Sequence, residues 1–240
     1  MKYLIIDERM REKEKEYFKM MGYQLLEIET SEEVYQEISA HVDIFACKVG
    51  NEVIIEPTQY IRMPKLPWII SGINNVEREY PFDIKYNVCT IGKKAFHLFR
   101  YTDTKVQQEL IKNGYELINT TQGYTNCSIA VIDGNSAIVT DKGLYQILKK
   151  EGIDVLYLED ELDIKLFKGM RYSEKKGFIG GCISRVGNDI VVFGDLNKID
   201  LHGKIRKFIE SKNIQIVDFE NLDVIDYGGV IEVKSDLSTF

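Results

Sequence analysis

The chain repeats one short pattern, and this repetition limits the folds that it can adopt. In each copy an apolar strand runs into a glycine-centred turn and continues as a second apolar strand, which is typical of a β-hairpin. Four copies are evident, with turn glycines at Gly50, Gly92, Gly134 and Gly187. The first three glycines are spaced 42 residues apart, whereas the fourth follows after 53 because the segment 160–176 is inserted.

Three of the hairpins lead into a predicted helix and then into a third strand. The helices are expected at 105–112, 144–150 and 204–212, each after an Asp or Thr that can cap its first turn. Each helix ends at Gly or Asn, residues that accept the left-handed conformation. The order strand, strand, helix, strand does not match the crossovers of an open α/β sheet, which is the alternative. We therefore expect an α/β propeller of β-β-α-β units.

The two ends of the chain each hold part of a fifth unit. Residues 2–6 form an apolar strand, followed by a charged helix at 8–21 and a strand at 22–28, but no hairpin partner precedes them. The missing strand lies at 228–233, which no helix follows. Pairing these segments would close a five-fold pseudosymmetric ring and remove exposed sheet edges. This predicts a single domain over 1–240, with units at about 227–240 plus 1–30, 31–82, 83–121, 122–176 and 177–226.

The second unit is irregular. Its segment 58–82 shows no clear helix, and all four prolines of the chain lie in it or beside it. We therefore expect the helix of this unit to be missing.

Composition restricts the functional classes. With 31 Lys and Arg against 38 Asp and Glu, the formal net charge is −7, and no dense basic stretch is present to bind nucleic acid. The apolar runs fall far short of the roughly 20 residues that cross a bilayer, so neither a membrane span nor a signal peptide is expected. Cysteines and histidines are scattered without metal-ligand spacing, so we predict no metal, no cofactor and a reducing, cytoplasmic location. The cysteines are Cys47, Cys89, Cys127 and Cys182.

Two short motifs add a resemblance to a known family. His41-Val42-Asp43-Ile44-Phe45 is similar to the His-x-Asp segment of arginine deiminases, and Asp226-Tyr227-Gly228-Gly229-Val230 is similar to the glycine-rich strand that carries their nucleophilic cysteine. With its five units the chain resembles the pentein superfamily, which includes deiminases, dimethylargininases and amidinotransferases. The resemblance implies a histidine acid/base and carboxylates that hold a guanidinium group. The usual cysteine is missing, because the last one is Cys182; the chain resembles most a bacterial branch for which no activity is implied.

The spacing from the turn glycines suggests a different nucleophile. Asp43 and Cys127 both lie seven residues before a turn glycine, so they should reach the ring axis at a similar height. His41 and Asp43, two residues apart on an expected strand, should face the same side. A one-residue slip at the ambiguous turn after Asp133 would turn Cys127 away. We predict His41, Asp43 and Cys127 as catalytic candidates, and as substrate-binding candidates Tyr124, Asn126, Asp226 and Tyr227.

Each candidate also has a purely structural interpretation. In that interpretation Cys127 is only a small buried apolar residue, His41 binds a backbone carbonyl, and Asp43 caps the junction. Tyr124 and Tyr227 would stack on a ligand or line the core.

These observations leave two hypotheses about function. The missing cysteine favours a catalytically silent or divergent pentein that binds a small cationic, guanidino-type molecule. The alternative is a Cys-dependent hydrolase or transferase acting on such a substrate. A homodimer is a further hypothesis, and Phe167-Lys168-Gly169-Met170 in the insertion is a candidate lid or dimer contact. A ribosome-binding role fits less well with an acidic chain.

Overall fold

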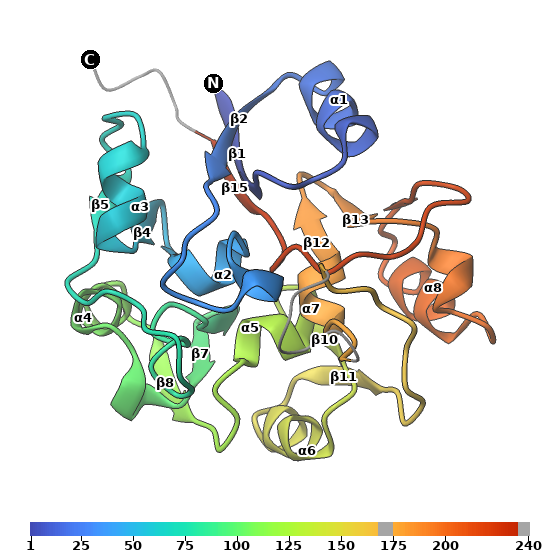
Figure 1. Ribbon diagram of the computed structural model, residues 1–240. Coiled ribbons are helices and arrows are strands. Elements are labelled where there is room, and N and C mark those ends of the chain that lie inside the picture. Colours follow the sequence, from blue (N-terminus) through green and yellow to red (C-terminus); the bar gives the residue numbers. More distant parts are fainter. Residues whose placement is uncertain (168–174, 235–240) are drawn as a thin grey trace.

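The computed structural model describes residues 1–167 and 175–234. In these residues, fifteen strands form five separate three-stranded sheets (Figure 1). Four sheets share one pattern, in which the first two strands form an antiparallel hairpin and the third runs parallel to the second. Their strands are β3 (Ala46–Val49), β4 (Glu52–Ile55) and β5 (Ile69–Ser71); β6 (Cys89–Ile91), β7 (Lys94–His97) and β8 (Glu116–Asn119); β9 (Ile129–Asp133), β10 (Ser136–Val139) and β11 (Asp154–Tyr157); and β12 (Ile183–Val186), β13 (Asp189–Val192) and β14 (Ile216–Val217).

The fifth sheet joins distant parts of the chain. Strand β15 (Ile231–Lys234) pairs antiparallel with β1 (Lys2–Asp7), and β1 pairs parallel with β2 (Tyr23–Ile28). The register places Lys2 opposite Lys234 and Ile5 opposite Ile231. The segments at the two ends of the repeat therefore supply strands to one sheet, which has the same strand pattern as the other four.

The longer helices lie at the periphery of the molecule (Figure 1). They are α1 (Glu12–Met20), α4 (Thr104–Lys112), α6 (Lys142–Lys150) and α8 (Lys204–Glu210). Asp103 caps α4 by accepting hydrogen bonds from two backbone N–H groups, and Asp141 caps α6 in the same way with one. Helix α6 buries Leu144 and Leu148 on one side, so its apolar face packs on the protein and its lysines face water.

The second unit contains a helix that the sequence analysis did not expect. Helix α3 (Pro57–Arg62) begins with proline at its first position, where the missing N–H has no cost. The carboxylate of Glu56 accepts hydrogen bonds from the backbone N–H groups of Thr58 and Gln59. The expectation of no helix was wrong because this proline starts a helix instead of breaking one.

Three one-turn helices lie near the middle of the molecule (Figure 1). They are α2 (Val42–Phe45), α5 (Thr125–Ser128) and α7 (Ile179–Cys182), and each directly precedes the first strand of a hairpin. Helices α5 and α7 pack so closely that a Cβ atom on Gly180 would overlap the backbone oxygen of Asn126. His41 and Asp43 were expected on a strand, but His41 is the residue before α2 and Asp43 lies within it. The backbone N–H groups of Val42 and Asp43 donate to Tyr227 and Gly228, which replaces strand pairing here.

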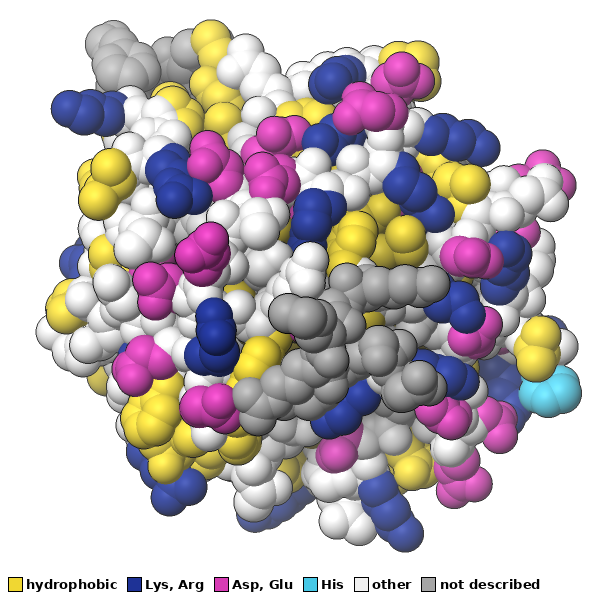
Figure 2. Space-filling model, in the orientation of Figure 1, with side chains coloured by type: hydrophobic (Ala, Val, Ile, Leu, Met, Phe, Trp, Pro, Cys, Tyr) yellow, Lys and Arg dark blue, Asp and Glu magenta, His cyan; other side chains and the backbone are white. Residues whose placement is uncertain are grey.

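The remaining 3-10 helices are short connections, at η1 (Gln36–Ile38), η2 (Phe99–Tyr101) and η3 (Leu196–Lys198). Apolar side chains fill the spaces between neighbouring sheets and under the helices; one cluster joins Ile5 of β1, Ile54 of β4 and Val106 of α4, which belong to two sheets and one helix. No helix in the described residues is long and apolar enough to cross a membrane. Figure 2 shows acidic and basic side chains interspersed over the described part of one face.

Candidate functional site

A pocket of about 350 Å³ lies beside the central one-turn helices. We call it the front pocket. Its wall includes three titratable side chains of the predicted site, His41, Cys127 and Asp226, and several aromatic rings. The lining residues are Tyr35, Glu37, Ile38, His41, Tyr80, Gln122, Tyr124, Cys127, Leu166, Lys175, Lys176, Phe178 and Asp226.

His41 is almost completely buried, and neither ring nitrogen has a hydrogen-bond partner among the described residues. Its Nδ1 lies 3.7 Å from Asp226 Oδ1. Burial, and then the positive charge of Arg9, holds the pKa of His41 well below its usual range. The imidazole is therefore neutral at physiological pH, with a ring nitrogen free to accept a proton or a hydrogen bond.

Asp226 is held by backbone groups. Its Oδ2 accepts a 2.8 Å hydrogen bond from Phe178 N, and its Oδ1 accepts one of 2.9 Å from Gly228 N. Burial raises its pKa to about 6 although these hydrogen bonds oppose the rise. A Cβ atom on Gly181 would overlap this carboxyl group, so glycine at that position makes room for it.

Cys127 on α5 is buried next to a second carboxyl group. Its Sγ lies 2.8 Å from Asp43 Oδ2 and 3.0 Å from Asn87 Nδ2. Burial, followed by the negative charges of Asp43 and Asp226, raises the pKa of the Cys127 thiol well above its usual range. The thiol form is therefore the stable form in this structure.

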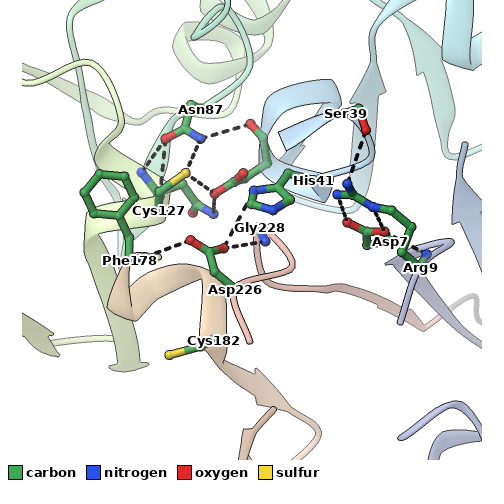
Figure 3. A network of polar contacts seen from close by, with 12 residues as sticks. Asp7, Arg9, Ser39, His41, Asn87, Cys127, Phe178, Cys182, Asp226 and Gly228 are labelled. Atoms are coloured by element: carbon green, nitrogen blue, oxygen red, sulfur yellow. Dashed lines mark hydrogen bonds and ion pairs between the residues drawn. The ribbon is translucent and has the colours of Figure 1, made fainter. Parts of the chain in front are cut away.

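Asn87 holds this arrangement together. Its Oδ1 accepts from the backbone N–H groups of Asn126 and Cys127, and its Nδ2 donates to the backbone oxygen of Asp43 as well as to the thiol. Figure 3 shows Cys127, His41 and Asp226 directed toward one another, while the sulfur of Cys182 points away. A polar side chain at the start of a hairpin strand, between Tyr86 and Val88, was the only sequence signal for Asn87.

Asp43 lies behind Cys127 and does not line the front pocket. Its Oδ2 receives the thiol and, at 3.4 Å, the Asn126 amide, whereas its Oδ1 has no partner among the described residues. Burial, and then the charge of Asp226, raises the pKa of Asp43 to about 7. Two carboxyl groups with raised pKa values thus lie close together.

Aromatic rings form one side of the front pocket. The ring centroids of Tyr80 and Tyr124 lie 5.6 Å apart, and those of Tyr124 and Phe178 lie 6.1 Å apart at an interplanar angle of 25°. The Tyr124 hydroxyl donates a hydrogen bond to Asp83 Oδ2 and is thereby fixed. Burial raises the pKa of Asp83 to about 6. The sequence analysis did not predict Tyr80, Asp83 or Phe178 as site residues, because only the fold brings their loops together.

The structure brings most of the predicted residues together. His41, Tyr124, Cys127 and Asp226 line the front pocket, and Asp43 and Asn126 lie immediately behind it. A one-residue shift, considered above as the case that would turn Cys127 away, is present: β9 carries a bulge opposite Ser136 and Ala137. Cys127 is therefore the third residue of α5, whereas Asp43 is the second of α2. On a helix one residue rotates a side chain by about 100°, not by 180°, and the thiol still reaches Asp43.

Tyr227 does not lie in the pocket, so its assignment to substrate binding was wrong. Its ring packs against Phe167 and Phe193, and its hydroxyl donates to Glu14 Oε2 at 2.9 Å. Neighbouring side chains along an extended segment point in opposite directions. Asp226 therefore points into the front pocket, and Tyr227 points away from it.

One position of the glycine-rich segment, Gly228, cannot accept a side chain. Gly228 has φ +68°, and a Cβ atom there would lie 2.6 Å from Asp43 Oδ1, 2.7 Å from His41 Cβ and 2.8 Å from Val42 N. This position therefore excludes any side chain in the present arrangement.

A family model described as "Family of unknown function (DUF6873)" matches residues 5–231. The chain belongs to this family. No curated protein matches the DUF6873 chain significantly. All four cysteines of this chain are buried and free, and no group of three or more His, Cys, Asp and Glu in its described residues is arranged to hold a metal ion.

Solved structures similar to this DUF6873 protein share its fold. The DDAH of Pseudomonas aeruginosa, a variant with serine in place of a cysteine and with citrulline bound, has a TM-score of 0.52 at 10% identity, covering 92% of this chain and 91% of that one. C. jejuni agmatine deiminase gives 0.52 at 14% identity, with 92% and 75% covered. The amidinotransferase SxtG of Microseira wollei gives 0.50 at 11%, with 93% and 78% covered. These are pentein-fold proteins, and the predicted resemblance to that superfamily is confirmed at the level of the fold.

Proposed function

We propose that the front pocket of this protein binds a small organic cation of the guanidino or amidino type. One observation supports this most strongly: two buried carboxyl groups, Asp43 and Asp226, lie close together, and neither forms an ion pair with Lys or Arg in the described residues. Buried carboxyl groups without a cation are costly, and a bound cation would lower both of their pKa values. A small cation beside Asp226 would therefore compensate buried negative charge, although Lys175 and Lys176 also line the pocket.

The wall of the pocket suits a flat cation. A planar guanidinium or amidinium group can stack on the Tyr124 and Phe178 rings while its N–H groups donate to Asp226 and to the neutral His41 nitrogen. Arg9 is already engaged with the Asp7 carboxylate, at 2.6 Å and 2.9 Å, so it does not compete for Asp226.

The relatives support this ligand class. The P. aeruginosa DDAH structure holds citrulline, and a C. jejuni agmatine deiminase variant was solved with substrate bound. Both ligands belong to those two proteins, which are 10% and 12% identical to this chain. For this chain they suggest only the class of ligand that we propose.

We favour binding without turnover, because the glycine-rich segment contains no cysteine and its residue Gly228 has no room for a side chain. A divergent reaction through Cys127 is the alternative, and the 2.8 Å contact between its thiol and Asp43 favours it. In that reaction sulfur would attack the amidine carbon, the thiol proton would pass through Asp43 to the leaving amine, and the C–N bond would break. Water would then cleave the S–C bond and restore the thiol.

The architecture is part of the proposal. We infer that the five sheets form a closed five-fold propeller in one domain, with unit boundaries at about 30, 82, 121, 176 and 226. The sheet that combines β15 with β1 and β2 supports this closure. The homodimer and the cytoplasmic location stay predictions, and residues 168–170 of the suggested lid or dimer contact lie outside the described residues.

Calorimetric titration with arginine, agmatine and citrulline tests the binding proposal. We expect saturable binding of the cationic ligands, at least tenfold weaker in Asp226→Asn. Asp223→Asn is the matched control, because Asp223 is three residues away, largely exposed and paired with Lys198 outside the pocket. Equal binding by both variants would contradict the proposal.

Mass spectrometry separates binding from chemistry. Incubation with 2-chloroacetamidine should label Cys127 before the other cysteines if a bound amidine lowers its pKa, and Cys127→Ala should abolish the fast label. Cys182→Ala is the control, since that thiol donates to Ile179 O and points away from the pocket. Labelling of all four cysteines at one rate would rule out an activated thiol, whereas a released amine in turnover assays would establish the alternative.

A further inference from the structure

A second pocket, of about 320 Å³, lies on the other side of Asp43. We call it the rear pocket. Asp43 and Asn126 line it, whereas Cys127, His41 and Asp226 do not. The two pockets therefore share no lining residue, and the hydrogen bond from Cys127 to Asp43 crosses the boundary between them.

Positive charge exceeds negative charge around the rear pocket. Lys48 from β3 and Arg185 from β12 line it, together with two carboxyl groups, Asp43 of α2 and Glu232 of β15. A third cation, Lys234, lies 3.5 Å from Glu232 Oε1. The Glu232 carboxylate is already engaged, because it also accepts hydrogen bonds from Tyr23 Oη at 2.6 Å and Gly187 N at 3.0 Å.

Backbone carbonyls, not carboxylates, satisfy the two lining cations. Lys48 Nζ donates to the backbone oxygen of Glu232, and Arg185 donates from Nη1 to Ile132 O at 2.9 Å and from Nε to Gly187 O at 3.3 Å. Neither side chain forms an ion pair within residues 1–167 and 175–234. No carboxylate is therefore in direct contact with either charge at the pocket wall.

Two further features suit an anion. Partial desolvation of the Lys48 ammonium group, whose side chain is otherwise exposed, lowers its pKa; Glu232 opposes this effect, Lys234 assists it, and a bound anion would reverse it. Asp43, with its pKa raised to about 7, is substantially protonated at neutral pH and can then donate a hydrogen bond instead of repelling the anion.

We propose that the rear pocket is a second binding site, for a small oxyanion such as a carboxylate or a phosphate, held between Lys48 and Arg185. Arg185 has a planar donor group suited to two oxygen atoms of one ligand, and Lys48 supplies a point charge from a different sheet. The protein carries a net charge of −7, so long-range attraction does not favour anions, and saturable binding would report a local site.

Inorganic phosphate and acetate are the probes, titrated at constant ionic strength with sodium chloride as the compensating salt. We expect saturable binding in calorimetry and a matching rise in the unfolding temperature. Arg185→Gln should weaken binding at least tenfold, and Arg185→Lys should recover part of the loss. Arg206→Gln is the matched control, because it removes the same charge from a side chain that lies 3.8 Å from Asp218, outside the rear pocket.

Lys48→Gln decides the question if Arg185→Gln does not fold, because Lys48 is exposed and its substitution should leave the fold intact. A loss of several-fold in Lys48→Gln but not in Arg206→Gln supports the site. No saturable binding, or equal weakening in all variants, overturns it. Asp226→Asn, which is directed at the front pocket, should change phosphate binding far less than Arg185→Gln, because it affects the rear pocket only through the ionisation of Asp43, so the two proposals can fail separately.

Discussion

Cys127 Sγ donates a 2.8 Å hydrogen bond to Asp43 Oδ2, and these two residues are 84 positions apart in the chain. The contact joins one-turn helix α5 to one-turn helix α2 at the centre of the molecule. It keeps the thiol protonated and gives a buried carboxyl group one of its few partners. The reactivity of the cysteine and the ionisation of Asp43 are therefore one coupled property of the site.

Asp43→Asn should change how stability depends on pH. A folded-state pKa of about 7, raised from the usual 3.8, means that the folded protein binds more protons than the unfolded chain between these values. Stability contributed at this site is therefore present below about pH 4 and lost as the pH rises to about 7. We expect Asp43→Asn to gain on the order of 1–3 kcal/mol over the native chain at pH 8 relative to pH 5.

Urea unfolding of both proteins at pH 5 and pH 8 measures this difference. The depressed pKa of His41 has the opposite pH dependence, but it is common to both proteins and cancels in the comparison. A stability difference that does not vary with pH would contradict the raised pKa of Asp43.

Gly228→Ala should strongly destabilise the protein. Both its positive φ of +68° and the contacts of 2.6–2.8 Å that a Cβ atom would make act against any side chain. Gly114→Ala is the control, because Gly114 has a similar φ of +71° with nothing within 4 Å of the added atom. We expect a loss of about 1 kcal/mol for Gly114→Ala and at least about 2 kcal/mol more for Gly228→Ala. Equal losses in thermal unfolding would show that only backbone strain matters at Gly228.

Tyr124→Phe should destabilise the protein more at high pH than at low pH. The change removes the hydrogen bond to Asp83, whose other carboxyl oxygen already has no partner among the described residues. Because the pKa of Asp83 is raised to about 6, the lost partner matters most when the carboxyl is ionised. We expect a loss of about 1–2 kcal/mol at pH 8 and less at pH 5. Tyr145→Phe, in the stacked pair with Tyr157 outside the front pocket, should have little effect at either pH.

Removal of the last strand should unfold the whole protein. A chain ending at Asp226 lacks β15, so β1 loses its antiparallel partner, the rear pocket loses wall residues, and Asp226 loses the hydrogen bond from Gly228 N. A chain ending at Lys234 keeps every described strand and is the control. Circular dichroism on heating would distinguish them, and a shortened chain that melted like the control would refute ring closure.

The sequence identified the parts of the fold that depend on local signals. Turn glycines such as Gly50 and Gly187 adopt positive φ, and the strands flanking them pair as hairpins. One-turn helices such as α2 have no periodicity to detect, so His41 and Asp43 were placed on a strand. The spacing to a turn glycine identified Asp43 and Cys127 as site residues. Asn87 and Phe178 were not identified, because they contact the site from other repeat units and no local sequence pattern encodes such contacts. Tyr227 was misplaced because the orientation of an irregular segment depends on its neighbours.

The final strand also has a consequence for biosynthesis. Asp226 lines the front pocket, Glu232 of β15 lines the rear pocket, and Gly228 and Gly229 lie between them in the chain. A ribosome must therefore translate past residue 226 before the lining of the front pocket is complete, and past residue 232 before that of the rear pocket is complete. A nascent chain can begin to pair its hairpins early, but both pockets have their full lining only once the segment 226–232 has been released.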